Sequence, residues 1–151
     1  MKSIYLDNAA TTPLSDSMKR YLISLLSVYG NPSSLHSVGE KADELITQAR
    51  EAVAGFLNAA PEDIFFTCSG SASNALAVRG LVPGNAPDER YEVFYSPTAH
   101  KSMLRACDSC RSHTPLKVNS AGEISLSYLD EILWKHSRLC PLVCIEAASS
   151  E

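Results

Sequence analysis

The chain changes from bulky to small side chains within the segment Ile64-Phe65-Phe66-Thr67-Cys68-Ser69-Gly70-Ser71. Its first four residues are mostly β-branched or aromatic, which predicts a strand over 64–67. Apolar residues at Leu76, Ala77 and Leu81 predict a helix over 71–81. The small residues between them would let backbone N–H groups approach an anion at the positive end of the helix dipole.

This loop is therefore a candidate phosphate cradle, to which the Ser71 hydroxyl would add a donor. The alternative is an ordinary helix cap, because serine and glycine are favoured at that position in any helix. The segment has neither the lysine of a Walker loop nor the glycine spacing of a dinucleotide-binding loop.

Helices and strands alternate on the C-terminal side of this segment. Strands are predicted at 92–95, 116–118 and 142–145, and helices at 99–112 and 126–135. Two further helices, 13–28 and 38–57, are predicted before it. This order predicts an α/β fold with a mainly parallel sheet of about four strands and flanking helices. The last predicted strand ends close to Glu151 and leaves an open sheet edge, which indicates part of a longer, truncated domain.

His100 is the second candidate functional residue. It follows the strand predicted at 92–95 and the turn Ser96-Pro97-Thr98, close to the start of the next helix. Ligands of open α/β sheets bind beyond the carboxyl ends of the strands, where His100 and the Ser71 loop would both lie. A histidine there could stack on an aromatic ring or move protons, and the alternative is a plain surface histidine.

Composition narrows the class of protein. The 151 residues are 45% hydrophobic and 20% charged, which is typical of one soluble globular domain. The net charge of -4 gives no support for binding nucleic acid or anionic membranes, and no apolar run is long enough to span a bilayer. The N-terminus has no secretory core, and five irregularly spaced cysteines favour reduced thiols in a cytoplasm.

Cys107-x-x-Cys110-x-x-His113, with Cys140 and Cys144 later, is compatible with a small zinc module. We discount this reading and expect no metal site. Cys107 and Cys110 fall three residues apart in a predicted helix, where thiols are commonly packing residues.

Four segments together resemble the NifS-like cysteine desulfurases of the class V aminotransferase family. Their order and spacing agree with that family over essentially the whole chain. The segments are YLDNAATTP at 5–13, YGNPSSLHSVG at 29–39, IFFTCSGSASN at 64–74 and AHKS at 99–102.

The resemblance implies a partial large domain of the fold type I transferases that use pyridoxal 5'-phosphate. Enzymes of this family convert L-cysteine to L-alanine and pass the sulfur to an acceptor protein, as in iron-sulfur cluster assembly. They are homodimers, and we expect a cytoplasmic location here. By resemblance, the Gly70 N–H and the Ser71 hydroxyl hold the cofactor phosphate, and His100 lies on the pyridine ring as the catalytic histidine. Ser150 takes the place of an asparagine beside the ring oxygen.

The chain also departs from the family pattern. Ser71-Ala72 stands where the family usually has Thr-Glu, and Ala148-Ser149-Ser150-Glu151 replaces a common Val/Ala-Asn-Asn-Glu. The family's Schiff-base lysine, its persulfide cysteine, its pyridine-pairing aspartate and its small domain lie beyond residue 151. Lys101 cannot replace that lysine, because neighbouring helical residues point about 100° apart and His100 already faces the ring.

Residues 1–151 are accordingly interpreted as the N-terminal arm plus the first part of the cofactor-binding large domain. We expect such a chain to bind the cofactor weakly and to be inactive alone, since covalent cofactor chemistry needs an activated amine. The alternative is a non-catalytic, degenerate domain that pairs with a partner chain through its open sheet edge.

Overall fold

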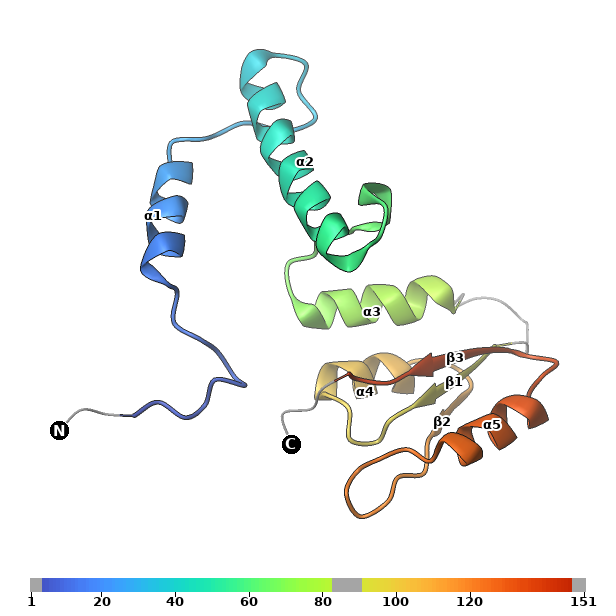
Figure 1. The fold of residues 1–151 in the computed structure, drawn as a ribbon. Coiled ribbons are helices and arrows are strands. Elements are labelled where there is room, and N and C mark those ends of the chain that lie inside the picture. Colours follow the sequence, from blue (N-terminus) through green and yellow to red (C-terminus); the bar gives the residue numbers. More distant parts are fainter. Residues whose placement is uncertain (1–3, 83–90, 148–151) are drawn as a thin grey trace. The chain divides into compact units, whose positions relative to one another are not determined.

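A computed structural model describes residues 4–82 and 91–147, and the chain divides into two compact units, Met1–Phe65 and Phe66–Glu151 (Figure 1). Ser150 and its neighbours at 148–151 lie outside the described residues. Within the described ranges, no helix has the length and apolar character needed to span a membrane.

The first unit consists mainly of two helices, α1 (Asp16–Leu25) and α2 (Ser37–Leu57), followed by a short 3-10 turn, η1 (Pro61–Asp63). Both helices were predicted. The helix α1 begins later than expected because Ser15 caps it by accepting a hydrogen bond from the Met18 N–H, and it also ends earlier, at Leu25. The His36 ring caps α2 by accepting from the Gly39 N–H at 3.3 Å. Asn58, in the left-handed conformation at φ 52°, ends α2.

The strand predicted at 64–67 does not form, so that prediction was wrong. The segment follows η1 as irregular chain, and Phe65 and Phe66 are exposed. A strand needs a neighbour to pair its backbone groups, and no described strand runs beside this segment. The carbonyl of Ile64 instead accepts a hydrogen bond from the Arg50 guanidinium of α2.

The second unit is built on three parallel strands in the order β2-β1-β3. They are β1 (Tyr91–Tyr95), β2 (His113–Pro115) and β3 (Cys140–Cys144). The parallel α/β sheet was predicted correctly, but the described residues form three strands rather than four. The strand predicted at 116–118 lies three residues earlier, because Val118 turns away into an antiparallel bridge with Ile124.

Three helices flank this sheet: α3 (Gly70–Leu81), α4 (Lys101–Asp108) and α5 (Leu126–Lys135). Figure 1 shows α3 and α4 on one side of the sheet and α5 on the other. Alternate residues of β1 serve the two sides, as the pleat requires. Val93 and Tyr95 belong to one hydrophobic cluster, and Phe94 belongs to the other.

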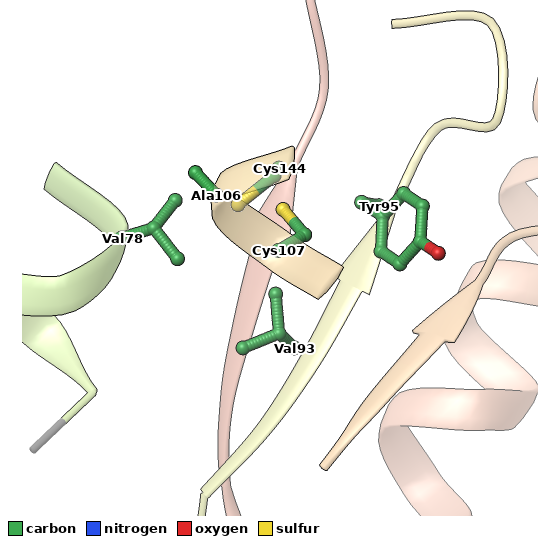
Figure 2. Packing of buried hydrophobic residues seen from close by; sticks show 6 residues of the cluster. All are labelled: Val78, Val93, Tyr95, Ala106, Cys107 and Cys144. Carbon is green, nitrogen blue, oxygen red and sulfur yellow. The ribbon is translucent and has the colours of Figure 1, made fainter. Parts of the chain in front are cut away.

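The main core lies between the sheet and the helices α3 and α4. Figure 2 shows the side chain of Cys107 from α4 close to Val93 and Tyr95 of β1, with Cys144 of β3 and Val78 of α3 nearby. Val93 and Cys107 are completely inaccessible to solvent. This dry layer fixes α3 and α4 on the sheet and so fixes where the two helices begin.

Candidate functional site

The small-residue loop leads directly into the first turn of α3. The Ser69 hydroxyl caps this helix by accepting a hydrogen bond from the Ala72 N–H at 3.2 Å. The Thr67 hydroxyl donates to the Ser69 carbonyl at 2.9 Å, which closes the loop on itself. The helix cap, which is the alternative to a phosphate cradle, is therefore present in this turn.

The N-terminus of α3 is open at Gly70. The N–H groups of Gly70 and Ser71 have no partner within the helix, since they precede its first turn of hydrogen bonds. A Cβ atom added at Gly70 would meet nothing within 4 Å, and the Ser71 side chain is exposed. This end of α3 therefore has room for an anion and donors to bind it.

His100 caps α4, the helix that follows β1. Its ring atom Nδ1 accepts a hydrogen bond from the Ser102 N–H at 3.1 Å and lies 2.7 Å from the Ser102 hydroxyl. Its backbone N–H donates to the Glu146 carboxylate at 2.8 Å, from the segment after β3. The His100 ring is exposed, and its position at the carboxyl end of β1 agrees with the sequence prediction.

Two hydrogen bonds show that α3 and α4 run side by side in the same direction. Near their beginnings, the Asn74 amide donates to the Ser102 hydroxyl at 2.9 Å. Near their ends, the Arg79 guanidinium donates to the Ser109 hydroxyl at 3.3 Å. The N-termini of both helices therefore lie at the same end of the pair, where their partial positive charges add.

This arrangement brings Gly70, Ser71 and His100 to one end of the second unit. A pocket of about 330 Å³ lies at the carboxyl ends of β1 and β3, beside α5 and the segment before it. Its lining includes Ser96, Ala99 and Glu146. The site thus offers helix N–H groups, a serine hydroxyl and an exposed imidazole at the sheet edge where α/β proteins bind ligands.

Three residues of this site were missed by the sequence analysis: Asn74, Ser102 and Glu146. Each acts through a hydrogen bond to His100 or to Ser102. Of the three, only Ser102 could have been proposed from the sequence, because it lies two residues after His100 at the start of a predicted helix. The predicted site residue Ser150 lies outside the described residues.

The cysteines do not gather into a metal site. Among the described residues, no group of three or more His, Cys, Asp and Glu side chains is placed to hold a metal ion. Cys107 lies in α4, whereas α4 ends before Cys110, so the predicted helix over 99–112 is too long. Burial, with a smaller contribution from nearby Cys144, raises the pKa of the Cys107 thiol to about 12, which favours a protonated packing residue. The zinc-module alternative finds no support in this geometry.

Sequence and structure comparisons give the same assignment. The aminotransferase class-V profile matches residues 4–151. The chain belongs to the class-V aminotransferase family. The resemblance drawn from the four sequence segments is confirmed.

Similar class-V proteins include cysteine desulfurases. One from a Nostoc species and an IscS-like one from Mycobacterium tuberculosis are each 32% identical to this chain. These matches cover 95% and 97% of the chain, which spans 36% and 39% of the relatives' own lengths.

Solved structures share the fold. A NifS-like protein from Rickettsia africae matches 93% of the chain with a TM-score of 0.78 at 30% identity. SspA in complex with cysteine matches 93% with a TM-score of 0.80 at 31% identity. The chain spans 38% and 41% of these structures, and the predicted fold class is confirmed.

The family implies pyridoxal phosphate, and the described residues fit the phosphate end of that cofactor. The open space at Gly70, the exposed Ser71 residue and the adjacent helix N-termini suit a dianion. The exposed His100 ring at the same end suits contact with a flat aromatic group.

Proposed function

We propose that this chain provides the N-terminal part of the pyridoxal-phosphate pocket of a cysteine desulfurase. The observation that carries the proposal is the shared end of α3 and α4, which brings Gly70, Ser71 and His100 together. The reaction converts L-cysteine to L-alanine and transfers the sulfur to an acceptor. The relatives named cysteine desulfurase and the structural neighbour in complex with cysteine support this substrate.

Each site residue has a separate task in this proposal. The N–H groups of Gly70 and Ser71 and the Ser71 hydroxyl bind the cofactor phosphate. His100 lies against the pyridine ring and moves protons, and Ser150 binds the ring oxygen with one hydroxyl donor. When bound, the cofactor supplies the electron sink for the chemistry at the substrate Cα.

The chain alone binds the cofactor without a covalent tether. None of its six lysines lies in a Ser/Gly-His-Lys segment of the family type, since Lys101 follows Ala99-His100. Residues 1–151 form the N-terminal arm and the first part of the large domain in this interpretation. The active enzyme is a cytoplasmic homodimer that serves a sulfur-acceptor protein, for example in iron-sulfur cluster assembly. The five free thiols are compatible with a reducing compartment.

A binding comparison tests the proposal. The chain is titrated with pyridoxal phosphate and with pyridoxal, which has the same ring and aldehyde but no phosphate. We expect the phosphorylated form to bind at least about tenfold more tightly, because charge-assisted hydrogen bonds hold its phosphate. We also expect borohydride reduction to label no single lysine. Equal affinity for the two compounds would exclude the phosphate cradle.

A turnover assay tests the role of the tether separately. The purified chain is incubated with pyridoxal phosphate and L-cysteine, and sulfide and alanine are measured. We expect neither product above a cofactor-only control. Alanine formed at a sustained rate by the chain alone would contradict the proposal that it lacks the tethering amine.

A non-catalytic domain that pairs with a partner chain is the second candidate function. One observation favours it: α1 buries none of its residues, although Met18, Tyr21 and Leu22 form an apolar stripe along it. An amphipathic helix of this kind buries its stripe against another helix or chain. Light scattering tests this second candidate, since a stable monomer with cooperative unfolding argues against obligatory pairing.

A further inference from the structure

His100 is held at one ring nitrogen by a directed chain of hydrogen bonds. The Ser102 N–H donates to Nδ1 at 3.1 Å, so Nδ1 is an acceptor and has no proton of its own. The Ser102 hydroxyl lies 2.7 Å from the same atom and must therefore be its second donor. A neutral imidazole with an unprotonated Nδ1 carries its proton on Nε2.

Asn74 sets the direction of this chain from the neighbouring helix. Its amide nitrogen donates to the Ser102 oxygen at 2.9 Å. That donation occupies a lone pair of the serine oxygen and leaves the hydroxyl proton for His100. Asn74 and Ser102 are half-buried between α3 and α4, whereas the His100 ring is exposed.

We propose that Asn74 and Ser102 are positioning residues that hold His100 in the tautomer with its proton on Nε2. This inference rests on the proposed function, in which the exposed face of the His100 ring meets the cofactor and the substrate. Nδ1 is occupied by Ser102, so Nε2 is the nitrogen that gives or takes the proton. The Glu146 carboxylate holds the backbone N–H of His100 at 2.8 Å and fixes the residue at the start of α4.

His113 provides a reference for the tautomer with its proton on Nδ1. Nδ1 of His113 lies 2.9 Å from the carbonyl oxygen of Cys110, and a carbonyl can only accept. A neutral His113 ring therefore carries its proton on Nδ1. Ring-nitrogen NMR of the protein labelled at histidine separates the two forms, with His100→Asn and His113→Asn variants used to assign the signals.

The chain also provides a matched control. Ser109 receives a donor from Arg79 of α3, just as Ser102 receives one from Asn74, but it does not contact His100. Ser102→Ala and Ser109→Ala therefore remove equivalent hydroxyls from the α3–α4 contact. Any general loosening of the helix pair affects both variants.

At a pH where the rings are neutral, we expect His100 of the wild-type chain to be in the Nε2–H form and His113 in the Nδ1–H form. Ser102→Ala is expected to lower the Nε2–H to Nδ1–H ratio of His100 by about fivefold, the equivalent of one net hydrogen bond. Asn74→Asp is expected to lower this ratio at least as much, because a carboxylate draws the Ser102 hydroxyl proton to itself. Ser102→Thr, which keeps the hydroxyl, is expected to retain the wild-type ratio.

Two results would overturn the proposal. One is a wild-type His100 with its proton on Nδ1, and the other is a Ser102→Ala ratio no different from that of Ser109→Ala. A variant in which His113 no longer shows the Nδ1–H form has lost its local structure. In that case the ratio in Ser102→Thr, compared with the wild type, tests the proposal. The measurement needs no cofactor, so it fails or succeeds independently of the pyridoxal-phosphate titration.

Discussion

Ser71 contributes the one side-chain hydroxyl that we assign to the phosphate. Replacing it in Ser71→Ala is expected to weaken pyridoxal phosphate binding by about ten- to a hundredfold, because a hydrogen bond to a charged group contributes about 1.5–3 kcal/mol. Pyridoxal binding should not change. Fluorescence titration of both compounds measures the difference.

The control for this variant is Ser73→Ala, in the first two turns of the same helix. The Ser73 hydroxyl lies 2.5 Å from that of Thr67 and so serves the loop rather than a ligand. Equal losses of affinity in Ser71→Ala and Ser73→Ala would show that the hydroxyl of Ser71 has no specific role.

The buried thiols give the second residue-scale prediction. Burial raises the pKa of Cys107 from 9.0 to about 12, and burial also raises the pKa values of Cys110, Cys144 and Tyr95. The unfolded chain therefore loses protons at lower pH than the folded chain. Stability is fully present below pH 9.0 and is lost as the pH rises towards about 12.

Urea unfolding across that pH range measures this slope. We expect the free energy of unfolding to fall less steeply in Cys107→Ala than in the wild type. Cys68→Ala removes an exposed thiol and is the control. A Cys107→Ala slope equal to that of the wild type would contradict the assignment of the alkaline loss to this buried thiol.

At the residue scale, the local sequence identified Ser71 and His100 as candidate site residues. It did not identify the residues whose hydrogen bonds hold His100 in place. Ser71 follows a loop of small residues, and His100 follows a Ser-Pro-Thr turn, and both features are visible in the sequence. Asn74 and Ser102 are 28 residues apart, and Glu146 is 46 residues from His100. Hydrogen bonds over such separations depend on how α3, α4 and β3 pack, which no short pattern encodes.

The cap of α3 gives the prediction at the scale of an element. Ser69→Ala removes the acceptor of the Ala72 N–H and is expected to cost about 1 kcal/mol of unfolding free energy. Ser69→Asp keeps an acceptor at the cap and should restore that stability. The added carboxylate would nevertheless repel a phosphate, so pyridoxal phosphate binding should fall in Ser69→Asp.

Urea midpoints of the two variants measure the effect on stability, and cofactor titrations measure the effect on pyridoxal phosphate binding. A stable Ser69→Asp variant that binds the cofactor as well as the wild type would show that the phosphate does not sit at the N-terminus of α3. The pair of variants thus distinguishes a helix cap from an anion site at one residue.

Elements with strong periodicity were predicted well, and elements defined by pairing were not. The helices predicted at 38–57 and 126–135 match α2 and α5 almost residue for residue, since an apolar stripe and a cap are local. The strand predicted at 64–67 has suitable residues but no neighbour, and β2 is displaced from 116–118 to His113–Pro115. Register depends on β1, where the backbone N–H of Leu116 donates to the carbonyl of Tyr95.

For the whole molecule, burial is unevenly divided between the two units. In α1 and α2 the buried residues are Gly39 and Ala54 alone, neither of which has a large side chain. The second unit holds both described hydrophobic clusters, including the fully buried Val93 and Phe94 of β1. Apolar burial is the main source of stability, so the second unit should be the stable part of the chain.

Hydrogen exchange measured by mass spectrometry tests this division. We expect amides of β1 to exchange most slowly and those of α2 to exchange faster by at least about tenfold, because helices with few buried contacts open locally. Val93→Ala, which opens a cavity beside Cys107, should speed exchange throughout β1, α3 and α4 while leaving α2 at its wild-type rate. Equal protection of α2 and β1, or a rise in α2 exchange in Val93→Ala, would mean that the two units unfold as one body.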